Sequence, residues 1–205
     1  PSHIVKEIED MKVSIFGLTT EDTPVKSSPI NTKPFNFIPV VEEAKKLVPT
    51  LRKETDILIA LTHIGHYPDE SNGADAPGDV TLARQVDGID LIVGGHTQKP
   101  MFEPDIQNGA IIVQAHEWGK YVGKVDLEFL DGKVTLVSSK LIPVNLKDSI
   151  VKIEPDAYVE AVLRPFKEKG DASLGVQLGI NEAELMGIAA TIRSGETNLG
   201  NLISR

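Results

Sequence analysis

The stretch Gly88-Ile-Asp-Leu-Ile-Val-Gly-Gly-His-Thr-Gln98 is a short apolar run that stops at two glycines and is followed by polar residues. Its β-branched residues predict a buried strand over 89–93. The glycines allow a sharp turn or a close backbone approach beyond that strand. In an extended segment, His96 and Gln98 leave the same side of the chain. An imidazole and an amide oxygen aimed at one point suit a metal ion, and a hydrogen-bonded loop histidine is the alternative.

A second apolar run, Ile57 to His63, also places a histidine at its carboxyl end. In open α/β sheets, ligands bind beyond the carboxyl ends of the strands. Neighbouring strands lie about 4.8 Å apart, so His63 and His96 could reach one cation if their strands are adjacent and parallel. We therefore interpret the pair as candidate metal ligands, with packing roles for both as the alternative.

Two further histidines lie close to these strand ends in the sequence. His116 follows a third apolar run at 111–114, where it either joins the set or packs against Trp118. His66 comes three residues after His63. Because the exit from a strand does not keep such a pair converging, we interpret His66 as a supporting or solvent-facing group rather than a ligand.

Composition excludes several classes of protein. The 205 residues are 40% hydrophobic and 25% charged, which is typical of a globular domain plus a piece of another. A net charge of -9 without any basic run argues against a nucleic-acid partner. The absence of cysteine excludes disulfides and thiolate zinc sites. No apolar run approaches the ~18 residues of a membrane span, so we predict no span, and no signal peptide is visible in these 205 residues.

The remaining patterns predict a mixed α/β chain in which a parallel core leads into an antiparallel hairpin. Pro49 should kink or split the helix at 38–54, and Pro165 should bend the helix at 155–170. We expect strands at 3–8 and 12–18, an irregular loop at 24–37, and helices at 38–54 and 80–86. A hairpin of 121–130 and 133–141 should turn at Asp131-Gly132. Beyond it we expect a helix at 155–170, a strand at 172–178, and a helix start near Glu196 that is cut off at Arg205.

Six motifs occur in an order that carries a family resemblance. They are Gly17-Leu-Thr-Thr-Glu-Asp-Thr23, Thr62-His-Ile-Gly-His-Tyr67, Ala76-Pro-Gly-Asp79, Ile92-Val-Gly-Gly-His-Thr-Gln98, Val113-Gln-Ala-His-Glu-Trp-Gly-Lys-Tyr-Val-Gly123 and Thr197-Asn-Leu-Gly200. Together they resemble the bacterial 5′-nucleotidase family of two-domain metallophosphoesterases, and most closely its periplasmic UDP-sugar hydrolase/5′-nucleotidase branch.

The resemblance implies a fold and an activity. Residues 1–150 would form the C-terminal half of a four-layer α/β/β/α metallophosphoesterase domain, 151–171 an interdomain linker helix, and 172–205 the truncated beginning of an α/β substrate-binding domain. The complete enzyme would use two divalent metal ions, zinc or manganese, to release phosphate from nucleoside 5′-monophosphates and to cleave UDP-sugars. It would act in the periplasm or at the cell surface.

The resemblance also assigns individual residues. His63 and His96 match ligands of one metal, and Gln98 matches a ligand of the other through its side-chain oxygen. His66 and His116 match positions near the site without a ligand role. The family's Asp-x-His motif, bridging aspartate and Asn-His pair would precede Pro1. We therefore expect no catalytic residue within these 205 residues and no activity without the missing N-terminal half.

Two alternatives to this function stay open at this point. One is a related 2′,3′-cyclic-nucleotide phosphodiesterase/3′-nucleotidase, which the C-terminal substrate pocket would distinguish. The other is a non-catalytic α/β binding domain that has lost its metals.

Overall fold

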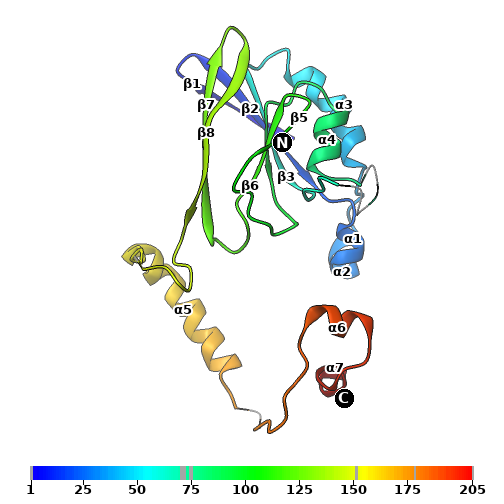
Figure 1. Ribbon diagram of the computed structural model, residues 1–205, viewed down its shortest axis with the longest axis vertical. Coiled ribbons are helices and arrows are strands. Elements are labelled where there is room, and N and C mark those ends of the chain that lie inside the picture. Colours follow the sequence, from blue (N-terminus) through cyan, green and yellow to red (C-terminus); the bar gives the residue numbers. More distant parts are fainter. Residues whose placement is uncertain (1, 70–72, 74–75, 151, 178, 205) are drawn as a thin grey trace. The chain divides into compact units, whose positions relative to one another are not determined.

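The computed structural model of the chain describes residues 2–69, 73, 76–150, 152–177 and 179–204. The chain divides into two compact units, Pro1–Ile153 and Glu154–Arg205. Two β-sheets and the helices packed on them build the first unit, and the second contains helices and connecting segments (Figure 1).

A six-stranded mixed sheet organises the first unit. Its inner strands are mutually parallel, and the strand at each edge runs antiparallel to its neighbour. In spatial order the strands are β1 (His3–Ile8), β2 (Met11–Thr19), β3 (Ile57–His63), β4 (Leu91–Gly94), β6 (Ala110–Gln114) and β5 (Asp105–Gln107). β3 and β4 are thus adjacent and parallel, which is the condition for His63 and His96 to reach one cation. Sequence patterns missed the three-residue edge strand β5.

Two helices, α3 (Val40–Leu51) and α4 (Asp79–Gln85), lie on one face of this sheet and form its main core (Figure 1). The apolar side of α3 contributes Ala44, Val48 and Leu51, all of them buried. The predicted split of this helix at Pro49 does not occur, because Pro49 stands in the last turn of α3, and the alternative of a kink there stays a prediction. There its missing N–H costs one bond at most, and Arg52 N–H still donates to Val48 O at 2.9 Å.

The segment predicted as an irregular loop at 24–37 contains two short helices, which corrects that prediction. They are α1 (Thr23–Lys26) and α2 (Pro29–Thr32), each with a proline in its first positions. Proline has its φ already fixed near the helical value and lacks only an N–H that a first turn leaves unpaired. Pro24 and Pro29 therefore begin helices within the segment that was predicted as a loop.

The second sheet is the hairpin of β7 (Tyr121–Leu130) and β8 (Lys133–Pro143), as predicted. Asp131 and Gly132 both have positive φ, 52° and 75°, as a two-residue hairpin turn requires. Part of the hairpin faces the side of the large sheet that α3 and α4 leave open. A cavity of about 290 Å³ separates them, with Val113 on one side and Val125 and Leu141 on the other.

The second unit begins with α5 (Ala157–Leu174), followed by α6 (Ala189–Ser194) and α7 (Asn198–Ser204). Asp156 caps α5 by accepting the N–H groups of Tyr158 and Val159, each at 3.0 Å. None of the described helices is long and apolar enough to cross a membrane. The predicted domain boundaries at 150 and 171 stay predictions.

The predicted helix end at 170 and the strand at 172–178 are wrong, because α5 continues to Leu174 and 175–177 form no strand. A glycine inside a helix costs about 1 kcal/mol relative to alanine, which is too little for Gly170 to end this one. The end comes where Gly175 N–H donates to Asp171 O at 2.8 Å. Residue 178 lies outside the described residues.

Candidate metal centre

Two histidines meet at the carboxyl edge of the sheet. His63 is the last residue of β3, and His96 follows β4 after Gly94 and Gly95. Their rings lie edge to face with centroids 5.2 Å apart. A Cβ at Gly95 would come within 3.0 Å of His63 Nδ1, so a glycine here lets the imidazole approach the turn. The structure thus brings together the two histidines that the sequence analysis selected.

The turn after β4 is not extended, which corrects the reason given for pairing His96 with Gln98. Their φ angles are 75° and 54°, in the left-handed region that non-glycine residues seldom adopt. Beyond β6, His116 and Trp118 also have positive φ, 75° and 51°. Backbone of this kind costs energy and is concentrated at functional sites. A metal-binding role for Gln98 stays a prediction.

His66 is held by a hydrogen-bonded network rather than left free for a metal. Its Nε2 lies 2.9 Å from Asp105 Oδ2, and its backbone N–H donates to Thr97 Oγ1 at 3.4 Å. Thr97 Oγ1 in turn donates to Gln114 Oε1 at 2.9 Å. This network fixes the segment after β3 against the turn after β4.

His116 stacks on Tyr121, with ring centroids 5.9 Å apart and an interplanar angle of 17°. Trp118 is instead 82% exposed and lies under the ammonium of Lys120. Packing of His116 against Trp118, one of the two alternatives, therefore does not occur. Within the described part of the chain, the buried Nδ1 of His116 has no hydrogen-bond partner.

Asp79 is a buried carboxylate that the sequence analysis did not select. Its Oδ1 accepts the Thr62 hydroxyl at 2.5 Å, and its backbone N–H donates to Gly65 O at 2.8 Å. A Cβ at Gly94 would overlap its Oδ2, which has no partner among the described residues. Asp79 therefore joins the ends of β3 and β4 to the start of α4.

Burial raises the pKa of Asp79 to about 6, against the opposing effects of the Thr62 hydrogen bond and of His66. An acid at the start of a helix is ordinarily explained by its favourable interaction with the positive end of the helix dipole. The pattern gives no sign that this one is buried.

Lys26 is a second residue that the sequence analysis missed. Its Nζ lies 3.4 Å from His96 Nε2 and 3.0 Å from Asp22 Oδ2. Burial lowers the pKa of His96, electrostatic interactions with Lys26 and His63 lower it further, and Asp22 opposes them. His96 therefore stays neutral over a wider pH range, and neutral imidazole is the form that binds metals.

The donor set fits part of a metal site. Two imidazoles that converge, with an amide side chain in the same turn, are the nitrogen and oxygen donors that zinc and manganese accept. A tetrahedral zinc ion takes four ligands, so His63 and His96 supply part of such a set. Among the residues that the structure describes, no group of three His, Cys, Asp or Glu side chains could hold an ion.

The chain has close relatives among curated proteins. It is 39% identical over 237 residues to the 5′-nucleotidase of Vibrio cholerae, which covers 100% of this chain and 43% of the relative. It is 37% identical over 229 residues to protein UshA of Escherichia coli, covering 95% of this chain and 42% of the relative. The chain belongs to the 5′-nucleotidase family of metallophosphoesterases. This family member spans about two fifths of the length of these relatives, and no protein-family model matches it.

Solved structures support the fold of this 5′-nucleotidase family chain. The calcineurin-like phosphoesterase YfkN from Bacillus subtilis superposes with a TM-score of 0.66 at 21% identity, covering 85% of this chain and 59% of YfkN. The predicted fold class, the C-terminal part of a mixed α/β metallophosphoesterase domain, is confirmed.

Proposed function

We propose that this chain is part of a metal-dependent phosphohydrolase that releases phosphate from nucleoside 5′-monophosphates and cleaves UDP-sugars. The observation that carries the proposal is the pair of strand-end imidazoles 5.2 Å apart, in a chain of the 5′-nucleotidase family. The lowered pKa of His96 supports it, because the ring is neutral and ready to bind a metal at neutral pH.

Two divalent ions, zinc or manganese, would be held with His63 and His96 on one and Gln98 on the other. Such a pair, when bound, polarises phosphoryl oxygens and acidifies a water molecule. The chain's own residues hold the ligands in place. The Thr62–Asp79 hydrogen bond fastens the end of β3 to the start of α4, and Gly95 makes room for the His63 ring.

The remaining parts of the proposal come from the family. Further ligands and the groups that stabilise the transition state would come from the missing N-terminal half of the enzyme, so the 205 residues alone would be inactive. The complete protein would work in the periplasm or at the cell surface.

The experiment compares His63→Ala, His96→Ala and His3→Ala in the full-length protein. His3 is the matched control, because it lies on edge strand β1 and its ring contacts Ser2 Oγ at 3.1 Å. We expect the hydrolytic activity of the first two variants to fall by more than about 100-fold. Removing a residue that only supports a metal ligand typically costs about 10–100-fold, and these variants remove a ligand itself. Bound zinc and manganese, measured by elemental analysis, should fall in parallel.

Phosphate release from AMP and cleavage of UDP-glucose are the readouts, with 2′,3′-cyclic AMP as the substrate of the alternative. Unchanged turnover in both variants would refute the enzymatic proposal. Preferential hydrolysis of the cyclic nucleotide would favour the phosphodiesterase alternative.

A further inference from the structure

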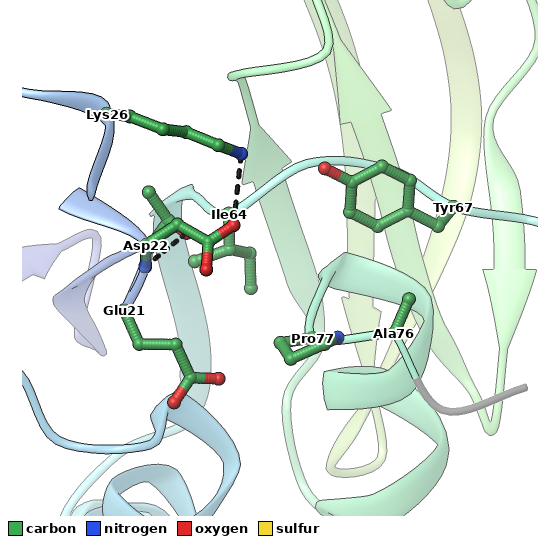
Figure 2. A pocket seen from close by; sticks show the side chains of 8 residues that line it. Glu21, Asp22, Lys26, Ile64, Tyr67, Ala76 and Pro77 are labelled. Carbon is green, nitrogen blue, oxygen red and sulfur yellow. Dashed lines mark hydrogen bonds and ion pairs between the residues drawn. The ribbon is translucent and has the colours of Figure 1, made fainter. Parts of the chain in front are cut away.

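A cavity of about 210 Å³ lies between the loop after β2 and the segment after β3 (Figure 2). Small-molecule pockets commonly measure about 300–1,000 Å³, so this cavity suits a group smaller than a nucleotide. Its lining consists of Thr20, Glu21, Asp22, Lys26, Ile64, Tyr67, Ala76 and Pro77.

The wall of this cavity is preorganised by glycines. A Cβ at Gly65 or Gly78 would come within 2.8 Å or 2.6 Å of the Tyr67 ring, so the ring lies directly on the backbone there. Gly65 also has a φ of 95°, which other residues seldom adopt. The ring is therefore fixed, and in Figure 2 its hydroxyl points toward the side of the cavity where Lys26 lies.

The opposite wall of the cavity, which includes Thr20 and Lys26, contacts the two histidines of the candidate metal centre. Thr20 N–H donates to His63 O at 3.1 Å, and Lys26 Nζ lies between Asp22 and His96. The cavity and the candidate metal centre thus share Lys26 as a common positive charge. A lysine at this position can bind a phosphoryl oxygen and stabilise its charge.

Two polar groups of the cavity have no partner within the described part of the chain. They are the carboxylate of Glu21 and the hydroxyl of Tyr67, and both side chains are only partly exposed. A carboxylate accepts hydrogen bonds from hydroxyl groups, a phenol both donates and accepts them, and its ring offers an apolar face. A hydroxyl-rich ring of sugar size combines these requirements.

We propose that this cavity binds the glycosyl group of a UDP-sugar, with Lys26 contacting the phosphoryl group that carries the sugar. The proposal deepens the proposed function and rests on it. Hydrolysis of AMP expels the nucleoside side of the substrate. If the nucleoside side is also the leaving group in a UDP-sugar, UMP departs. The phosphorus that carries the sugar would then lie at the metal centre.

The reaction then balances without a further reactant. A water oxygen bonds to the sugar-bearing phosphorus, the bridging P–O bond breaks, and its electron pair leaves with UMP. The protons of the water pass to solvent, and the products are UMP and a sugar 1-phosphate. The sugar stays on the attacked phosphorus and needs space beside the metal centre, where AMP carries only an oxygen.

The test uses the full-length protein with Glu21→Gln, which removes the accepting charge, and Ala76→Leu, which fills the cavity. Glu7→Gln is the matched control, because Glu7 is exposed on edge strand β1. We expect the ratio of kcat/KM for UDP-glucose to kcat/KM for AMP to fall at least 10-fold in both variants. The control should keep the wild-type ratio, and bound metal should be the same in all four proteins.

Equilibrium binding supplies a second readout. Calorimetry should show that α-D-glucose 1-phosphate binds more weakly to Glu21→Gln than to wild type, with binding of inorganic phosphate unchanged. An unaltered substrate ratio, or equal binding of glucose 1-phosphate by both proteins, would overturn the cavity proposal. A wild-type protein inactive on AMP would overturn the proposed phosphohydrolase function itself, and one active on AMP alone would overturn both its UDP-sugar cleavage and the cavity proposal.

Discussion

One face of the six-stranded sheet is covered by helices, whereas the opposite face, which is also apolar, is covered only in part. One row across the strands, Phe16, Ala60, Ile92 and Ile112, is at most 1% exposed under α3 and α4. The next row points to the opposite face, where Leu61 is 48% and Val93 is 36% exposed, although Leu91 and Ile111 on that face are buried. Parallel sheets are normally covered on both faces. An apolar strand sequence therefore predicts that both sides of the strand can be buried. Which face is packed against helices is decided only by the tertiary structure.

The largest effect should come from opening the covered face. Ile92→Ala removes fully buried atoms and should lower the free energy of unfolding by about 2–5 kcal/mol. Leu61→Ala, the matched change on the open face, should cost less than about 1 kcal/mol in the 205-residue chain. Urea denaturation measures both. Equal losses would show that Leu61 is buried in solution and that the two faces do not differ.

A smaller effect should depend on pH through Asp79, which lies on the covered side. Its pKa of about 6 in the folded state exceeds the ordinary value of 3.8, so the folded protein binds this proton more tightly than the unfolded one does. The resulting stability is fully present below about pH 4 and is lost as the pH rises through 6. At 1.36 kcal/mol per pKa unit the total is on the order of 3 kcal/mol.

Asp79→Asn keeps an acceptor for Thr62 and removes the titration. We expect unfolding of metal-free protein to show wild-type stability falling relative to the variant between about pH 4 and pH 6.5. A constant difference between the two proteins over that range would contradict a raised pKa.

The smallest effect should be Leu61→Ser on the open face. The free energy of unfolding of the chain should change by less than about 0.5 kcal/mol, because exposed positions contribute little. Self-association, measured by sedimentation, should decrease as the exposed apolar surface shrinks. A large loss of stability would show that this face is covered in solution.

Local patterns were sufficient for much of the fold. Apolar runs located β2, β3 and β6, and Asp131-Gly132 located the hairpin, because period and turn chemistry are encoded in neighbouring residues. The strand predicted at 172–178 was wrong because its local pattern is ambiguous. Its short apolar run fits a strand or a helix equally, and the preceding helical turns of α5 decide the outcome.

The candidate site divides in the same way. His63 and His96 stand at strand ends, a position that periodicity reveals. Lys26 reaches His96 from 70 residues away, and Asp79 is buried against Thr62 of β3 and Gly94 of β4. No local signal reports such contacts. The left-handed turn at His96 was equally hidden, because two glycines before it permit many conformations.

The β7–β8 hairpin also has a consequence for the order of folding. Its strands are joined by two residues, and hairpins of this kind close within about 1–10 μs. The large sheet instead pairs residues as distant in sequence as Val13 and Ile57, and such non-local contacts form slowly. We expect the hairpin to form before β2, β3 and β4 have paired with one another. It would then offer an early surface against which the rest of the first unit packs.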